Sequence, residues 1–422
     1  MFERVFRALE EVNPWAAPYT ALGFWREAYL QRLKPFLGNR LVKVLLGQRR
    51  TGKSYLLRQL IHFLMGEKGV PGKNIFYLNK EYFGFDEVRT ASDLEEVFRY
   101  YLERMNPEGR VYIFLDEIQN VQRWELFVNS YSQHLSGRYE VFVTGSNSTL
   151  LSSELATFLS GRYVEFFVYP FSFEEYCAWL GRERSQSSFL EYIRIGGLPE
   201  LLTLSSEEVR LHYLSSLRDT IILRDIVERY RIKEPVLLER LFNFLSANTG
   251  NLTSISSIIK YFKQWQKKTN YETLSAYIDY LLRSFLIHKA PRYKLRGKET
   301  LGGAAKYYLN DPAFRTYLQG YYPTDVGYHL ENYVFMYLKA CGYRVYVGIL
   351  DGKEIDFVAE KGTDRLYIQV AYLLSDPKVI RREFGNLQAI PDNYPKWVLS
   401  MDDSTFSDFE GIRHGRIWEF RV

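Results

Sequence analysis

One short segment has the composition of a phosphate-binding loop. Residues 47–54 read Gly-Gln-Arg-Arg-Thr-Gly-Lys-Ser and fit the pattern GxxxxGK[ST]. In such a loop the glycines let backbone amides approach phosphate oxygens, the lysine reaches the β- and γ-phosphates, and the last hydroxyl binds Mg²⁺. We therefore predict that Lys53 contacts phosphate and acts in catalysis, and that Ser54 is a magnesium ligand. The other predicted ATP-binding residues of this segment are Gly47, Gln48, Arg49, Arg50, Thr51, Gly52 and Tyr55.

A strand must precede this loop and a helix must follow it. Residues 41–46, Leu-Val-Lys-Val-Leu-Leu, are typical of a buried strand, and apolar spacing predicts a helix from Lys53 to about Met65. The amino end of that helix adds positive potential where phosphates bind. This context favours phosphate binding over an ordinary glycine turn.

A second apolar strand ends in two carboxylates. Residues 111–115 read Val-Tyr-Ile-Phe-Leu, and Asp116 and Glu117 follow directly. We predict that Asp116 holds magnesium through water and that Glu117 orients or deprotonates the attacking water. A strand followed by two acids is common, but with Lys53 it indicates hydrolysis of a phosphoanhydride. A small-molecule kinase also uses such a loop, but the adjacent carboxylates fit hydrolysis better.

Polar residues also follow a third predicted strand, residues 139–144. Ser146 and Asn147 come directly after it, and either could sense the γ-phosphate or help to hold the water; the alternative is an ordinary turn. Arg162 follows at a distance that suits an arginine finger acting on the nucleotide of a neighbouring subunit. The alternative for Arg162 is a contact with backbone or with a carboxylate. The finger role would require a homo-oligomer.

The composition describes a folded protein of several domains. With 422 residues, 46% of them hydrophobic and 17% aromatic, the chain can build two to four cores. A net charge of +5 permits a nucleic-acid partner without indicating one. The two cysteines, Cys177 and Cys341, are far apart and suggest neither a disulfide framework nor a zinc site. No apolar run approaches the roughly 18 residues of a membrane helix, so we expect a cytoplasmic protein without a membrane partner.

The order of predicted elements gives an α/β fold class with four domains. In residues 1–170 strands alternate with helices, which predicts a parallel sheet of the P-loop NTPase type. Residues 171–234 are predicted to form a helical lid. Residues 235–320 contain three predicted helices and a basic hairpin, which suggests a winged helix-turn-helix. Residues 321–422 mix helices with strands and predict a second α/β domain.

Together these motifs resemble the AAA+-like prokaryotic ATP-binding proteins that join a P-loop core to a C-terminal nuclease-related domain of unknown function. The resemblance spans nearly the whole chain and implies ATP and Mg²⁺ as cofactors, with ATP binding and hydrolysis as the activity. The segments that carry it are residues 47–54, 115–119, 144–147, 159–162, 170–176, 196–199 and 306–311.

The last domain departs from the nuclease pattern that its fold suggests. A PD-(D/E)xK site needs a carboxylate at a strand start and, on the next strand, an acid two residues before a lysine. Asp356 supplies the first carboxylate and Glu331 on the preceding helix could add another, but the next strand has Gln369 in the acid position and Ala371 where lysine belongs. We therefore expect a nuclease-like PD-(D/E)xK fold without efficient cleavage, in which Glu331, Asp356 and Gln369 form a degenerate site. Three other cations could replace the missing lysine: Lys353, Lys378 and Arg381.

The predicted winged helix carries positive charge that would suit phosphate contacts to DNA. The alternative is a protein-interaction domain with a solvated charged face. Its basic residues and the interleaved aromatic are Lys260, Lys263, Lys267, Lys268, His288, Lys289, Arg292, Tyr293, Lys294, Arg296 and Lys298.

Two functional hypotheses follow from these predictions. In the first, an ATPase couples hydrolysis to domain rearrangement on a DNA or protein partner. In the second, the protein is a slow nucleotide-dependent switch or scaffold. A third, an ATP-dependent nuclease, is disfavoured by Ala371.

Overall fold

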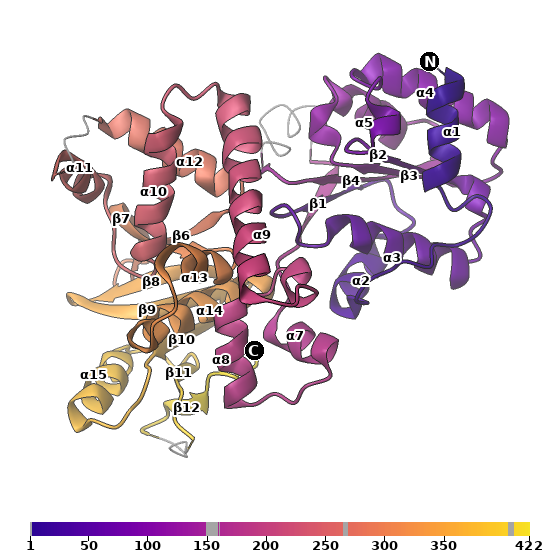
Figure 1. Ribbon diagram of the computed structural model, residues 1–422. Coiled ribbons are helices and arrows are strands. Elements are labelled where there is room, and N and C mark those ends of the chain that lie inside the picture. The colour runs from indigo at the N-terminus through magenta and orange to yellow at the C-terminus, as the bar shows by residue number, and fades with distance from the viewer. Residues whose placement is uncertain (1, 149–158, 160, 265–268, 404–408) are drawn as a thin grey trace. The chain divides into compact units, whose positions relative to one another are not determined.

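The computed structural model describes residues 2–148, 159, 161–264, 269–403 and 409–422. The predicted DNA-contact residues Lys267 and Lys268, and Ser160 beside Arg162, lie outside these ranges. The chain divides into two compact units, Met1–Val168 and Tyr169–Val422 (Figure 1).

The first unit is built on a five-stranded parallel sheet with the order β2-β3-β4-β1-β5. This order places β4 between β1, which leads into the phosphate loop, and β3, which leads into the two carboxylates. The predicted P-loop α/β sheet is therefore confirmed. Its strands are β1 (Val42–Leu46), β2 (Ile75–Asn79), β3 (Val111–Asp116), β4 (Tyr139–Gly145) and β5 (Tyr163–Phe167).

Helices cover both faces of this sheet (Figure 1). The predicted helix after the phosphate loop is α3, whose leucines pack into the core below β1. Before β1, the helix α2 ends at Leu33 and continues into a 3-10 turn that contains Pro35. The helices are α1 (Phe2–Val12), α2 (Glu27–Leu33), α3 (Lys53–Gly66), α4 (Ala91–Met105) and α5 (Trp124–Ser132), with 3-10 turns η1 (Lys34–Phe36), η2 (Gly72–Asn74), η3 (Phe83–Phe85) and η4 (Ile118–Asn120).

The second unit begins with helices. Helix α9 continues directly into a π-helix, η7, and the apolar sides of these helices form one core with α10, α11 and α12. Within the described part of the chain, no helix is long and apolar enough to cross a membrane. The helices are α7 (Phe173–Leu180), α8 (Gln186–Ile195), η6 (Pro199–Leu202), α9 (Glu207–Asp219), η7 (Thr220–Glu228), α10 (Pro235–Ala247), α11 (Ile255–Gln264), α12 (Tyr271–Arg283), α13 (Ala313–Gln319), η8 (Pro323–Asp325), α14 (Val326–Ala340) and α15 (Pro377–Gln388).

A seven-stranded mixed sheet completes the second unit, in the order β12-β11-β10-β9-β8-β6-β7. The predicted basic hairpin forms β6 and β7, but β6 also pairs with β8, for example at Arg292 and Val347. This one sheet therefore spans the boundary predicted at residue 320, which the sequence pattern did not indicate. The winged-helix and nuclease-like descriptions stay predictions. The strands are β6 (Ile287–Lys294), β7 (Glu299–Leu309), β8 (Arg344–Leu350), β9 (Lys353–Lys361), β10 (Asp364–Val370), β11 (Lys396–Ser400) and β12 (Arg413–Arg416).

Candidate active site

The phosphate loop connects the end of β1 to the first turn of α3, and its two glycines have backbone roles. Gly47 has φ +159°, and a Cβ there would lie 2.2 Å from the carbonyl oxygen of Val168. Gly52 has φ +94° and precedes the first residue of α3. Left-handed backbone of this kind favours glycine because it has no Cβ. The backbone conformation therefore requires glycine at both positions of the motif.

Lys53 is almost completely buried at the start of α3. Its ammonium donates hydrogen bonds to the carbonyl oxygens of Gly47 (2.9 Å) and Gln48 (3.1 Å). The same nitrogen lies 3.3 Å from Oε1 of Glu117. The structure therefore brings together the predicted phosphate-binding lysine and the predicted catalytic carboxylate.

Asp116 lies at the end of β3 and is completely buried. The hydroxyl of Tyr77 donates to its Oδ2 at 2.8 Å, and the hydroxyl of Thr144 donates to its Oδ1. Burial and the charge of Glu117 raise the pKa of Asp116, while hydrogen bonds from Thr144, Ser54 and Tyr77 act in the opposite direction. The two predicted magnesium ligands, Ser54 and Asp116, are thus within hydrogen-bonding reach of each other. A hydroxyl and a carboxylate are suitable donors for Mg²⁺ that also binds substrate phosphates.

Glu117 follows in a left-handed backbone conformation, with φ 54° and ψ 43°. Its backbone N–H donates to the hydroxyl of Thr144 at 2.9 Å, and Gln119 Nε2 donates to its Oε2 at 2.5 Å. Burial by itself would raise the pKa of Glu117, but the ammonium of Lys53 and the hydrogen bond from Gln119 hold the pKa below its ordinary value. Glu117 is therefore kept as a carboxylate, the form that can accept a proton.

The two polar residues predicted after β4 are both buried. Ser146 lies beside the Glu117 network, because its Oγ is 3.3 Å from Gln119 Nε2. Asn147, the next residue, is fully buried. Their proposed contact with the γ-phosphate stays a prediction.

The remaining predicted loop residues have different surroundings. Thr51 donates from Oγ1 to the carbonyl oxygen of Gln48 at 3.0 Å, which closes the loop internally. Arg49 pairs with Glu81. Arg50 and Tyr55 are exposed.

Four residues that the sequence did not single out support this site. Tyr77 and Thr144 hold Asp116, Gln119 holds Glu117, and Arg26 donates to the carbonyl oxygen of Thr51 at 3.1 Å. Gln119 and Thr144 lie in two of the segments that carried the family resemblance, 115–119 and 144–147, although neither was given a role. Tyr77 and Arg26 come from other segments, which only the order of strands and helices brings to the site.

The comparisons with known proteins agree with this geometry. A model of the AAA domain matches residues 39–177, which contain the loop and both carboxylates. An uncharacterized protein of Haemophilus influenzae is 37% identical over 393 residues, covering 92% of this chain and 96% of the relative. This chain belongs to the AAA-domain family of P-loop ATPases. ATP binding and hydrolysis are the activities that this family suggests.

Other similarities extend beyond the AAA domain. Residues 186–325 match a domain of unknown function (DUF8612). An uncharacterized protein of Methanocaldococcus jannaschii is 29% identical over 389 residues, covering 86% of this chain and 83% of the relative. The crystal structure of Cdc6p from Pyrobaculum aerophilum is similar with a TM-score of 0.30 and 16% identity, covering 69% of this chain and 91% of that one. A structural likeness of this size carries no conclusion about this chain.

Arg162 lies at the other end of the AAA-domain sheet from the phosphate loop. It is exposed and immediately precedes β5, and its carbonyl oxygen accepts a hydrogen bond from Val42 at the start of β1. Because β1 and β5 are parallel and a strand rises roughly 3.3 Å per residue, Arg162 is on the order of 15 Å from Gly47. The arginine is therefore not part of the site formed around its own subunit's phosphate loop.

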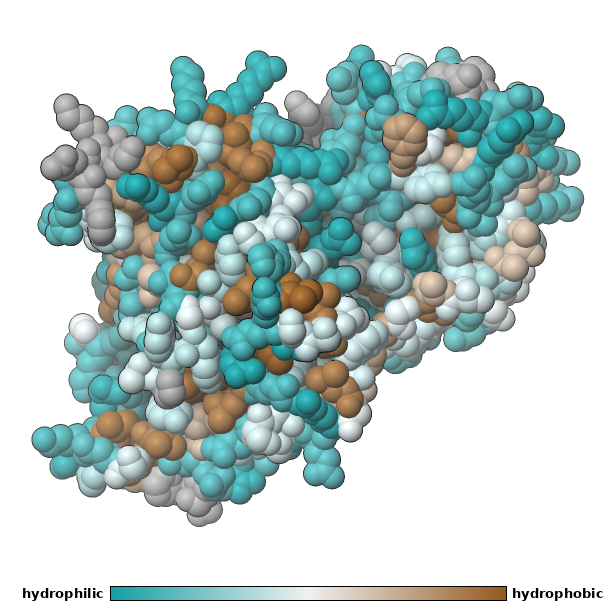
Figure 2. Space-filling model, viewed as in Figure 1, coloured by the Kyte–Doolittle hydropathy of each residue, from teal (hydrophilic) through white to brown (hydrophobic). Residues whose placement is uncertain are grey.

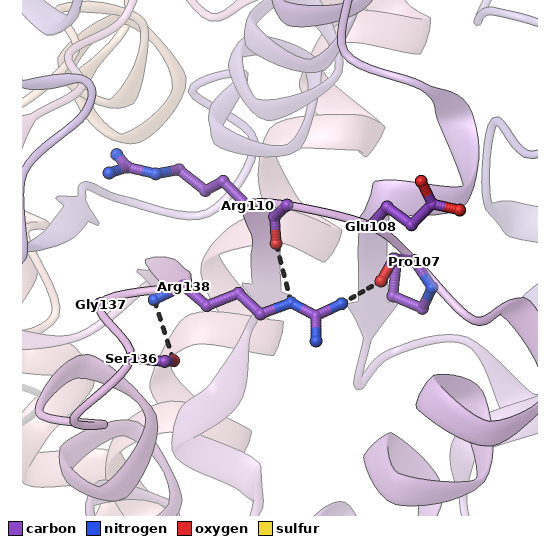
Figure 3. Close-up of a pocket in the computed structure, with 7 residues that line it drawn as sticks. Pro107, Glu108, Arg110, Ser136, Gly137 and Arg138 are labelled. Atoms are coloured by element: carbon purple, nitrogen blue, oxygen red, sulfur yellow. Dashed lines mark hydrogen bonds between the residues drawn. The ribbon is translucent and has the colours of Figure 1, made fainter.

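A surface pocket of about 570 Å³ also lies at that end of the sheet, where β3 and β4 begin. Figure 3 shows the side chain of Arg138 crossing this pocket, with its guanidinium donating to the carbonyl oxygens of Gly109 (2.7 Å) and Pro107. The pocket is formed by the two loops that precede β3 and β4. It is separate from the phosphate loop, which follows the opposite end of β1.

In the second unit, Glu331 and Asp356 of the predicted nuclease-like site lie around a lysine, Lys306, that the sequence analysis did not assign to that site. Lys306 comes from β7 and is buried, and its ammonium lies 2.8 Å from Glu331, 2.7 Å from Glu354 and 3.7 Å from Asp356. Tyr308 also donates to Glu331 at 2.5 Å. We call these five residues the Lys306 cluster. The lysine of this cluster lies on β7, a strand of the hairpin, and not at the position of Ala371, where the nuclease pattern places its lysine.

Gln369, in the predicted acid position, is engaged on both ends of its amide. Its Oε1 accepts from the backbone N–H of Asp356, and its Nε2 donates to Glu383, both at 2.7 Å. The amide of Gln369 thus links β9, β10 and α15.

Asp356 itself has a perturbed pKa. Burial and the charge of Glu331 raise the pKa of Asp356 to about 7, although Lys306 opposes this.

The three cations considered as replacements, Lys353, Lys378 and Arg381, are all exposed. Among the residues that the structure describes, no three His, Cys, Asp or Glu side chains are arranged as a metal-binding group. The Lys306 cluster is therefore arranged as a set of ion pairs.

Proposed function

We propose that this protein binds Mg²⁺-ATP at the phosphate loop and hydrolyses it to ADP and phosphate. The observation that supports this best is the 3.3 Å approach of Lys53 to Glu117, with Asp116 and Ser54 beside them. A cation for the phosphates, two oxygen donors for magnesium and a carboxylate for water are the groups that the reaction needs. No other cluster in the described residues combines them.

The proposed reaction assigns one task to each group. Ser54 and Asp116 would hold the magnesium, which neutralises phosphate charge when bound. Lys53 would turn from the loop carbonyls to the β- and γ-phosphate oxygens. Glu117 would accept the proton of the water whose oxygen attacks the γ-phosphorus, while the bond from that phosphorus to the ADP oxygen breaks.

We further propose that turnover is coupled to rearrangement of the second unit on a macromolecular partner. A protein is favoured over DNA, because two of the hairpin's cations already pair with carboxylates. Lys294 lies 3.5 Å from Glu299, and Arg296 lies 2.9 Å from Asp351. Apolar residues also appear in patches on the surface (Figure 2), and the exposed ones of the helical part include Val209, Leu211, Leu223, Val236 and Leu252.

A slow switch is the second candidate, and one contact favours it. While Glu117 pairs with Lys53, neither group can perform its step, so the pair must separate before hydrolysis. A protein that separates them rarely would retain ATP and signal by its bound state. Turnover numbers distinguish this candidate from the first.

Arg162 is proposed to act on a neighbouring copy, because it is exposed and distant from its own phosphate loop. That role implies a homo-oligomer. A cytoplasmic location is also proposed, and it is consistent with Cys177 and Cys341 forming no disulfide in the described residues.

The first experiment is steady-state phosphate release from Mg²⁺-ATP by the wild type and by Glu117→Gln, with and without duplex DNA at low salt. We expect turnover in the wild type and a loss of about 100-fold or more in the variant, which retains nucleotide binding. Stimulation by DNA would reverse our preference for a protein partner. Wild-type protein that binds ATP without turnover would support the switch, and protein that does not bind ATP would refute both candidates.

A further inference from the structure

Gln119 makes the closest side-chain contact to Glu117. It lies two residues further along the chain, in the 3-10 turn η4. Its Nε2 donates to Glu117 Oε2 at 2.5 Å and lies 3.3 Å from Ser146 Oγ. The amide of Gln119 therefore connects the end of β3 to the end of β4.

The chemistry of the partner determines how this amide is oriented. A carboxylate can only accept hydrogen bonds, so the NH₂ group of Gln119 must face Glu117 and Oε1 must face the other way. Oε1 of Gln119 is buried and has no hydrogen-bond partner among the residues that the structure describes. Leaving a buried acceptor unpaired costs roughly 1–3 kcal/mol, and such exceptions call for a functional explanation.

The two oxygens of Glu117 have different neighbours. Lys53 approaches Oε1, whereas Gln119 donates to Oε2. If Lys53 moves to a phosphate, Oε1 becomes available while Oε2 stays anchored to Gln119. The carboxylate would then keep its orientation at the step in which it is needed.

We propose that Gln119 is a water-positioning residue of the hydrolysis reaction, a role that rests on the proposed ATPase function. Its NH₂ group holds Oε2 of Glu117, and its Oε1, once the movement of Lys53 to the phosphates has admitted water, accepts one hydrogen of the attacking water. Oε1 of Glu117 accepts the other hydrogen and takes that proton as the new P–O bond forms. The water is thereby held through both hydrogens, with a lone pair free for the γ-phosphorus.

The test uses two substitutions of this residue in the full-length protein. Gln119→Glu keeps the shape but removes the donor, and Gln119→Leu removes both polar atoms. We expect kcat to fall about 10- to 100-fold in each variant, with KM and nucleotide affinity changed by less than about threefold. Gln122→Leu, the same change at an exposed position three residues further on, is the matched control and should retain wild-type kcat.

A double-mutant cycle separates positioning from a general effect on the fold. If Gln119 acts with Glu117 on one water, Gln119→Leu should cause no further loss in the Glu117→Gln background, because residues that act as a unit are not additive. Independent, multiplicative losses would contradict the proposal, as would a Gln119→Leu variant with wild-type kcat. Nucleotide affinity of each variant, measured in parallel, reports whether the loop has kept its structure.

Phosphate release by the wild type distinguishes failure of the ATPase proposal from failure of the Gln119 proposal. If it binds nucleotide without turnover, the ATPase proposal and the role of Gln119 fall together. If it hydrolyses ATP and the Gln119 variants do so equally well, only the role of Gln119 is refuted.

Discussion

The carboxylate of Asp311 accepts a hydrogen bond at 2.8 Å from the backbone N–H of Gly197, which is 114 positions away in the sequence. Its other oxygen accepts from Ala313 N at 2.9 Å. Gly196 has φ +93°, and a Cβ there would lie 2.1 Å from Asp311 Oδ1. Two of the segments that carried the family resemblance therefore meet at one buried carboxylate, for which glycine leaves the space.

Asp311→Asn tests the electrostatics of this contact. Burial raises the pKa of Asp311 from 3.8 to about 6. The folded chain thus binds this proton more tightly than the unfolded chain does, so the group's contribution to stability is complete below about pH 4 and is lost as the pH rises through about 6. Asparagine cannot titrate and leaves one N–H without an acceptor, so the variant should be less stable at pH 4.5. The deficit should then shrink by up to ~3 kcal/mol at pH 7.5.

The measurement is the free energy of unfolding in urea for both proteins at the two pH values. Titrating groups shared by the two proteins cancel in the difference. A deficit that is constant with pH, or that grows as pH rises, would contradict the burial of an ionisable carboxylate at this position.

Thr144→Val should impair hydrolysis although Thr144 is not expected to touch the nucleotide. Its hydroxyl donates to Asp116 and accepts from the backbone N–H of Glu117, so it orients both carboxylates. Valine has nearly the same shape but can form neither of these hydrogen bonds. We therefore expect kcat to fall by about 10-fold or more. Thr144→Ser retains the hydroxyl and should stay within about threefold of wild type. Equal activity of the valine and serine variants in a phosphate-release assay would show that the hydroxyl has no such role.

Lys306→Met should destabilise the second unit strongly. Its ammonium lies within 3.7 Å of Glu331, Glu354 and Asp356, and removing one partner of a buried ion pair typically costs about 3–5 kcal/mol. Adding Glu354→Gln to Lys306→Met removes one of the uncompensated charges and should recover part of this loss. Denaturant titration of the wild type, of Lys306→Met and of the double variant measures the free energy of unfolding of each protein. A double variant less stable than Lys306→Met would contradict the ion-pair description.

Mixing two inactive proteins tests the proposed role of Arg162. Glu117→Gln retains Arg162, and Arg162→Ala retains Glu117, so a mixed oligomer would contain intact sites only if the arginine acts between subunits. We expect each variant alone to lose about 100-fold or more in kcat, and the mixture to regain measurable phosphate release. Arg89→Ala, at an exposed arginine of the same unit, should remain active as the control. Full activity of Arg162→Ala alone would exclude an arginine-finger role.

Sequence alone determined the parts of this protein whose chemistry is contiguous along the chain. The phosphate loop, the helix that starts at Lys53 and the strand that ends at Asp116 were all predictable, because spacing within one element fixes where side chains lie. Gln119 belongs to the same class, since it lies two residues from Glu117, although its role was not foreseen.

Tertiary structure decided which distant residues complete each site. Tyr77 and Thr144 reach Asp116 only because β2 and β4 both flank β3. Lys306 reaches Glu331, Glu354 and Asp356 only because the β6–β7 hairpin continues the sheet through β8. Strand order is set by the packing of the whole core, and local periodicity carries no information about it, so these contacts could not be predicted from the sequence.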